Sequence, residues 1–169
     1  MRANLRTLTL LAAMIASLTL PGTHAWAVQD YTRTIVVDFD DFRLLLLDED
    51  GRELQSFPVV LPRKTPQLPV EGVVQAVIVN PWWYPTQGTR KAYFQKYGVE
   101  LPERIPPGNP QNAMGAIKVV VLFTTEGANP TIRIHGTNAP EYIEQRVRVS
   151  RGCIRMYNED ALALASAIE

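Results

Sequence analysis

Residues 116–123 read AIKVVVLF and residues 73–80 read VVQAVIVN, and these two stretches decide the fold class. Both are apolar, rich in valine and shorter than a typical helix. Because β-branched side chains favour extended backbone, each stretch is predicted to form a buried strand. The chain is therefore expected to be built around a β-sheet.

Other short apolar segments bounded by turn residues extend this pattern. They are predicted to form strands at residues 33–38 (RTIVVD), 42–47 (FRLLLL), 52–60 and 131–134 (TIRI). Turns rather than helices join most of them. The pattern therefore favours a mainly β fold, a sandwich or a barrel, over a doubly wound α/β fold.

Two segments interrupt the strands. Residues 81–112 are rich in proline, aromatic residues and glycine, and long loops of this kind usually serve as lids or binding loops. Inside this insertion a short helix is predicted over Arg90–Tyr97, with Thr89 as its N-cap. A second helix is predicted over residues 159–168, capped by Asn158. One or two short helices and a long lid-like insertion are thus expected beside the sheet.

The N-terminus has the pattern of a secretory signal. Residues 1–6 carry arginines and no acid, residues 8–20 are almost wholly apolar, and Ala25-Trp26-Ala27 offers small residues at a cleavage position. The apolar run is too short for a stable membrane anchor. We predict that residues 1–27 are a cleaved signal peptide and that residues 28–169 form a single domain without a membrane anchor. An uncleaved anchor is the alternative.

Composition excludes several function classes. Lys and Arg number 17, and Asp and Glu also number 17, so no overall positive field attracts nucleic acid. The single cysteine excludes an intrachain disulfide framework, and two histidines leave little for a zinc site. We expect no cofactor, no metal and no nucleic-acid partner.

The single cysteine, Cys153, and His135 form the chemically informative pair. An exported chain with one unpaired cysteine either buries the thiol or uses its reactivity. Gly152 beside Cys153 leaves room for a carbonyl group to approach the sulfur. An imidazole can take the thiol proton, and the thiolate can then attack the carbonyl. Nucleophilic catalysis is one interpretation, and a buried cysteine with a hydrogen-bonded histidine is the other.

The pattern around this pair resembles the L,D-transpeptidase (YkuD-type) catalytic domains of Gram-negative envelope enzymes. The matching motif is His135-Gly136-Thr137 followed by Ser150-Arg151-Gly152-Cys153-Ile154-Arg155. Residues 80–85, 97–102 and 106–108 also resemble the insertion of the Gram-negative members. The resemblance covers residues 31–160 and favours the catalytic interpretation.

The resemblance implies a role for each matching residue. Cys153 would be the nucleophile and His135 its base, with the Gly136 carbonyl orienting the imidazole. The backbone amides of Gly152 and Cys153 would form the oxyanion hole. The implied fold is an L,D-transpeptidase-like β-sandwich whose active site lies under a lid.

Arginines surround the pair and are candidates for binding substrate carboxylates. By strand alternation Arg133 shares a face with His135, opposite Ile132 and Ile134. The substrate-binding residues are expected to be Arg133, Ser150, Arg151 and Arg155. For Arg146 and Arg148, which alternate along one strand face with Ser150, substrate contact and a solvated basic edge strand both stay open.

Two features depart from the family. Arg151 stands where the motif has a second histidine, and an arginine cannot act as a base. Its charge is expected to lower the pKa of the Cys153 thiol. The turn at residues 65–69 lacks the family glycine, which affects the edge of the substrate groove.

The resemblance implies a peptidoglycan L,D-transpeptidase of the periplasm, active in cell wall biogenesis. Cys153 would form a thioester with a tetrapeptide stem, release D-Ala and pass the stem to an amine. The acceptor would be a second stem, giving a 3→3 cross-link, or an envelope protein. The alternatives are a hydrolase of the same bonds (a carboxypeptidase or an amidase) and a catalytically inactive peptidoglycan-binding domain.

Overall fold

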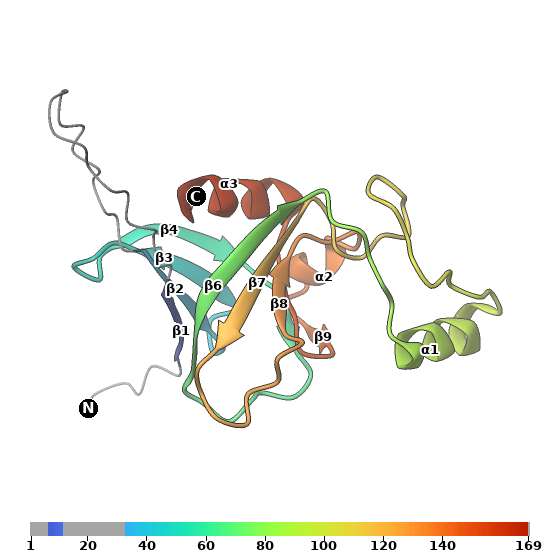
Figure 1. Cartoon of the computed structure of the whole chain (residues 1–169), viewed down its shortest axis with the longest axis horizontal. Helices are drawn as coiled ribbons and strands as arrows, with labels where there is room; N and C mark the ends of the chain where they lie inside the picture. Colours follow the sequence, from blue (N-terminus) through green and yellow to red (C-terminus); the bar gives the residue numbers. More distant parts are fainter. Residues whose placement is uncertain (1–6, 12–32, 169) are drawn as a thin grey trace, which may run out of the picture.

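The computed structural model describes residues 7–11 and 33–168 (Figure 1). Its strands are β1 (Thr7–Leu11), β2 (Thr34–Asp38), β3 (Arg43–Leu47), β4 (Glu53–Pro58), β5 (Leu61–Pro62), β6 (Val70–Val79), β7 (Ile117–Phe123), β8 (Arg133–His135), β9 (Arg148–Ser150) and β10 (Ile154–Arg155). Its helices are α1 (Gln87–Tyr97), α2 (Glu141–Glu144) and α3 (Asn158–Ile168).

The strands form one large mixed sheet and one small one. The large sheet has the order β10-β8-β7-β6-β1-β2-β3-β4, and β5 pairs with β9 in the second sheet. The pairs β2–β3, β3–β4, β6–β7 and β7–β8 are antiparallel, whereas β8 and β10 run parallel. The parallel β8–β10 pair positions the site, because it brings the segment after Cys153 beside the strand that ends in His135.

The hydrophobic core lies between the two halves of the large sheet and α3. Ile35 and Leu44 from the β2–β3 half pack in one cluster with Ile117 and Ile134 from the β7–β8 half. Leu164 of α3, which lies along one edge of the sandwich in Figure 1, is buried in the same cluster. The expected mainly β, sandwich-like fold is confirmed.

Several predicted elements differ in detail. Helix α1 begins at Gln87 rather than Arg90, because the Thr86 hydroxyl accepts a hydrogen bond from the Thr89 N–H and so caps the helix earlier. The described residues contain three helices rather than the expected one or two, because the sequence pattern does not indicate α2. A single short turn of helix leaves too little periodicity in the sequence to be recognised.

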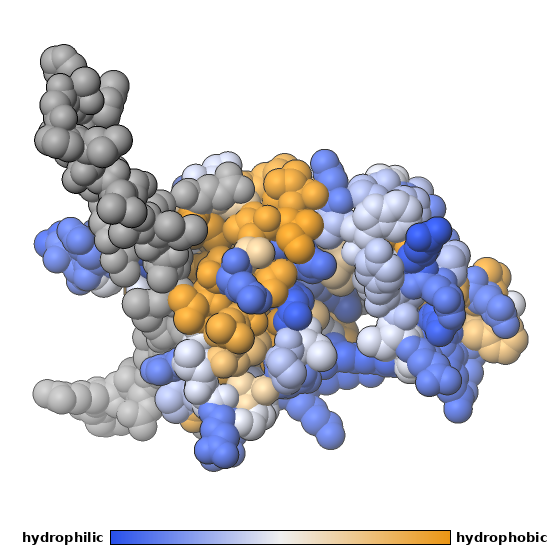
Figure 2. Space-filling view, in the orientation of Figure 1, coloured by the Kyte–Doolittle hydropathy of each residue, from blue (hydrophilic) through white to orange (hydrophobic). Residues whose placement is uncertain are grey.

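Strand β6 is less buried than its valine-rich sequence predicts. Ile78 and Val79 are exposed on it, and Leu122 of the neighbouring β7 is 56% exposed. Figure 2 shows apolar side chains gathered over the outer face of these two strands. The continuous apolar run predicts the strand correctly. The expectation that the strand is buried is wrong for one of its faces, which is exposed.

The insertion at residues 81–112 is fastened at its base by a buried asparagine. The Asn112 side-chain amide donates to the carbonyl oxygens of Pro81 at 2.9 Å and Pro106 at 3.0 Å, and its oxygen accepts from the Met114 N–H at 2.9 Å. From this base α1 extends away from the sheet, with no buried side chain of its own (Figure 1). The insertion therefore projects from the side of the sandwich.

The predicted signal peptide falls mostly outside the described residues. Of its length only Thr7–Leu11 are described, as β1, which pairs antiparallel with β2 and parallel with β6. Residues 1–6 and 12–27 are not described, and the signal peptide stays a prediction. Within the described ranges no helix has the length and apolarity needed to cross a membrane.

Candidate active site

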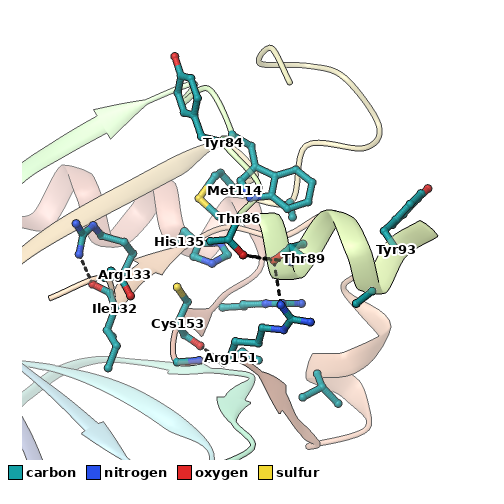
Figure 3. Close-up of a pocket in the computed structure, with 18 of the residues that line it drawn as sticks. Tyr84, Thr86, Thr89, Tyr93, Met114, Ile132, Arg133, His135, Arg151 and Cys153 are labelled. Carbon is teal, nitrogen blue, oxygen red and sulfur yellow. Dashed lines mark hydrogen bonds between the residues drawn. The ribbon is translucent and has the colours of Figure 1, made fainter. Parts of the chain in front are cut away.

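An open pocket of about 620 Å³ lies between the insertion and the end of the sheet (Figure 3). Seven residues that the sequence analysis predicted for the site line this pocket, from residues 133–135 and 150–155 of the chain. They are Arg133, His135, Ser150, Arg151, Gly152, Cys153 and Arg155. The opposite wall comes from the insertion and includes Tyr84, Thr89 and Tyr93. Among the described residues no cluster of His, Cys, Asp and Glu is arranged to hold a metal ion.

His135 is the last residue of β8, and its side chain is buried. Its Nδ1 lies 2.6 Å from the carbonyl oxygen of Gly136. A carbonyl can only accept, so Nδ1 carries the proton and Nε2 is left as the basic nitrogen. Figure 3 shows the Cys153 sulfur directed toward this imidazole. The structure thus brings Cys153, His135 and the Gly136 carbonyl together.

Asn158 holds the backbone that carries the Gly136 carbonyl. Its side-chain oxygen accepts from the N–H groups of Ala116 at 3.0 Å and Thr137 at 3.2 Å, and its amide donates to the Thr137 carbonyl at 3.0 Å. In the sequence Asn158 was recognisable only as a helix cap. Its tie to residues 116 and 137 depends on where α3 begins relative to the sheet, which no local pattern encodes.

The loop before Cys153 is shaped by Ser150 and Gly152. The buried Ser150 hydroxyl donates to the Cys153 carbonyl at 2.5 Å and accepts from the Gly152 N–H at 3.2 Å. Gly152 has φ 148°, a conformation that favours glycine. This differs from the expected oxyanion hole, because the Gly152 amide is already engaged by Ser150.

Burial and neighbouring cations keep the imidazole neutral. Desolvation, followed by the charge of Arg155, lowers the pKa of His135 to about 4. The Lys118 ammonium acts in the same direction, against the hydrogen bond to the Gly136 carbonyl. At neutral pH His135 is therefore an unprotonated base.

The thiol differs from the sequence expectation of a low pKa. Burial raises the pKa of Cys153 and outweighs the backbone hydrogen bond from Arg133 and the charges of Arg155 and Arg133, which lower it. Arg151 is not among these causes. At rest the pair is therefore a thiol beside a neutral imidazole, not a thiolate beside an imidazolium.

This resting state predicts the pH dependence of Cys153 alkylation. A raised thiol pKa means that the thiolate fraction is small at neutral pH and grows as pH rises. The rate with iodoacetamide is expected to increase about tenfold per pH unit between pH 6 and 8, with a midpoint above the value of about 8.5 for a free thiol. Mass spectrometry of the single cysteine measures the rate. A plateau reached below pH 7 would contradict this resting state.

Arg151 lies farther from the chemistry than expected. Its guanidinium reaches the Thr89 hydroxyl of α1 at 3.4 Å and leads away from the sulfur (Figure 3). The structure gives no support to the expectation that the Arg151 charge lowers the thiol pKa. The cations that act on the thiol are Arg133 and Arg155.

The other arginines mostly bind backbone. The Arg133 guanidinium donates to the carbonyl oxygens of Pro130 at 2.5 Å and Ile132 at 2.6 Å. Ile132 precedes β8 and lines the pocket together with Arg133 and His135, although strand alternation placed it on the opposite face.

Arg146 and Arg148 do not line the pocket. They fasten the segment before Cys153 to the β2–β3 turn: Arg146 donates to the Asp41 carbonyl at 2.8 Å, and Arg148 donates to the Phe39 carbonyl and to the Thr65 hydroxyl. Arg146 also lies outside β9 and has φ 50°. Substrate contact therefore has no support for either residue. The solvated-edge alternative fits in part, because Arg146 is exposed and Arg148 lies on β9 of the two-stranded β5–β9 sheet.

Comparison with known proteins gives a consistent result. The family model of the L,D-transpeptidase catalytic domain, YkuD, matches residues 32–169. The probable L,D-transpeptidase ErfK/SrfK of Escherichia coli (strain K12) is 36% identical over 130 residues, which cover 75% of this chain and 38% of that protein. The probable L,D-transpeptidase YcfS of the same strain is 30% identical over 139 residues, covering 79% and 40%.

The chain spans about two fifths of the length of these curated relatives. Among solved structures, L,D-transpeptidase 3 from Mycobacterium tuberculosis superposes with a TM-score of 0.45 at 14% identity, covering 81% of this chain and 64% of that chain.

Proposed function

The chain belongs to the YkuD family of L,D-transpeptidase catalytic domains, and we propose that it is a cysteine L,D-transpeptidase acting on peptidoglycan stem peptides in the periplasm. One observation carries the chemistry: the Cys153 sulfur faces a neutral imidazole whose other nitrogen is held by the Gly136 carbonyl. A nucleophile, its base and an orienting group are the parts that acyl transfer through a thioester needs.

The proposed reaction has two halves. In the first, His135 Nε2 takes the Cys153 proton while the sulfur attacks the carbonyl between the third residue and D-Ala of a tetrapeptide stem. The C–N bond then breaks, the imidazolium returns its proton to the leaving nitrogen, and free D-Ala departs. In the second half, His135 takes a proton from an acceptor amine while the amine nitrogen attacks the thioester carbon. The C–S bond then breaks, and the imidazolium returns the proton to the sulfur.

The negative oxygen formed in each half needs hydrogen-bond donors. The Cys153 N–H is the backbone donor that we assign to it, because the Gly152 N–H is engaged by Ser150. Ser150 accordingly acts by shaping the loop rather than by binding substrate. We propose that the amine acceptor is diaminopimelate of a second stem or a lysine of an envelope protein.

Incubating the purified protein with tetrapeptide muropeptides tests this function by mass spectrometry of the products. Loss of D-Ala together with a cross-linked dimer is expected. Tripeptide without dimer would indicate hydrolysis, and unchanged tetrapeptide bound by the protein would indicate an inactive binding domain. Cys153→Ala is the control, because it removes the sulfur and must abolish every product.

A further inference from the structure

The strand register places a cation on each side of the His135 imidazole. Lys118 of β7 is the direct antiparallel partner of His135, and Arg155 of β10 is its direct partner on the opposite side. Residues directly opposite one another on neighbouring strands project from the same face of a sheet. All three side chains accordingly line the pocket that holds Cys153. We call Lys118, His135 and Arg155 the basic row.

Neither cation of the basic row has an anionic partner among the described residues. No Asp or Glu of residues 7–11 and 33–168 lines the pocket, and the ion pairs found there involve other arginines, namely Arg43, Arg52 and Arg90. The Nε of Arg155 is buried and has no hydrogen-bond partner in this part of the chain. A desolvated guanidinium without a counter-charge costs stability, so folding does not explain its position.

The other two arginines near Cys153 already donate hydrogen bonds within the protein. Arg133 donates to two backbone carbonyls, and Arg151 contacts the Thr89 hydroxyl. By contrast, the Nε of Arg155 has no partner among the described residues, and Arg155 lines the pocket that holds Cys153. Arg155 is the direct strand partner of His135, and its charge acts to lower the pKa of the imidazole and opposes the rise that burial causes in the pKa of the Cys153 thiol.

We propose that Lys118 and Arg155 form a carboxylate-binding subsite beside Cys153, which holds the C-terminal carboxylate of the D-Ala that leaves. The existence of the subsite follows from the basic row, whereas the identity of its ligand rests on the proposed function. In a tetrapeptide donor this carboxylate is the nearest one to the attacked carbonyl. Arg63, another cation lining the pocket, adds to the same positive potential.

This subsite predicts a preference of Cys153 for an anionic alkylating reagent. Iodoacetate and iodoacetamide attack the same thiolate, so the ratio of their rates cancels any change in the thiol pKa and reports the local positive charge. Arg155→Met and Lys118→Met are each expected to lower the iodoacetate-to-iodoacetamide ratio about three- to tenfold. Arg155→Lys is expected to retain most of it.

Arg52→Met is the matched control, because it removes one arginine charge from the exposed turn between β3 and β4 and should leave the ratio unchanged. The melting temperature of Arg155→Met is expected not to fall, since the guanidinium has no partner to lose. An unchanged ratio in both Arg155→Met and Lys118→Met would overturn the subsite.

A second measurement separates the subsite from the proposed function. With a tetrapeptide whose C-terminus is a free acid, Arg155→Met is expected to raise KM about tenfold, whereas a C-terminal amide should show no such difference between wild type and variant. If the wild-type protein converts neither peptide, the proposed function fails and the alkylation ratio still decides the subsite. If the rise in KM persists with the amide, the carboxylate bound is not that of D-Ala and the assignment of the ligand is wrong.

Discussion

Replacing His135 by alanine is expected to lower the turnover of tetrapeptide stems about a thousandfold, the typical contribution of a positioned general base. The thiol pKa is raised by burial, so without His135 little thiolate forms at neutral pH. Among the described residues no other histidine lines the pocket to take the proton in its place. The rate of D-Ala release, measured at pH 7 with saturating stem peptide, checks the prediction.

Two comparisons distinguish lost chemistry from lost structure. His135→Gln keeps most of the volume and a donor for the Gly136 carbonyl, so it should fold like the wild type and be equally inactive. In both variants the residual rate should rise with pH, because hydroxide can replace the missing base. In the wild type the turnover rate should decrease as the pH is lowered through about 4, because the imidazole becomes protonated there. Turnover of His135→Ala within threefold of wild type would exclude His135 as the base.

Gly136→Ala is expected to lower the unfolding free energy by about 2–3 kcal/mol and activity by more than tenfold. A Cβ at this position would lie 2.2 Å from the Asn158 side-chain oxygen and 3.0 Å from the Ala116 nitrogen. Asn158 must then release its hydrogen bonds, or the Gly136 carbonyl must move away from His135 Nδ1. Urea unfolding and stem turnover measure the two effects.

Gly127→Ala is the control for this substitution. Gly127 has φ 74° and open space around it, so alanine there costs about 1 kcal/mol of backbone strain and leaves turnover unchanged. Asn158→Ala tests the coupling: if the clash with Asn158 is the cause, the double variant Gly136→Ala/Asn158→Ala loses less stability than the sum of the single variants. Additive losses would place the cause elsewhere.

Much of the fold could be predicted from local sequence. Strands β2, β3 and β7 begin and end within one or two residues of the predicted segments, because β-branched and leucine-rich runs bounded by turn residues encode extended backbone locally. The early start of α1 was missed because Thr86 and Thr89 are both suitable caps, and the observed hydrogen bond between them decides which one is used.

Short-range patterns and motif spacing are enough to predict the mainly β architecture and the residue types that meet around Cys153 and His135. The role of each neighbouring residue depends on the packing of distant segments. The tertiary structure placed Lys118 and Arg155 on either side of His135, turned Arg151 toward α1, and engaged the Gly152 amide with Ser150. It also raised the thiol pKa that the nearby arginines had been expected to lower. These differences arise because strand register and burial depth depend on contacts between distant segments, and they control which charges meet and how strongly the charges interact.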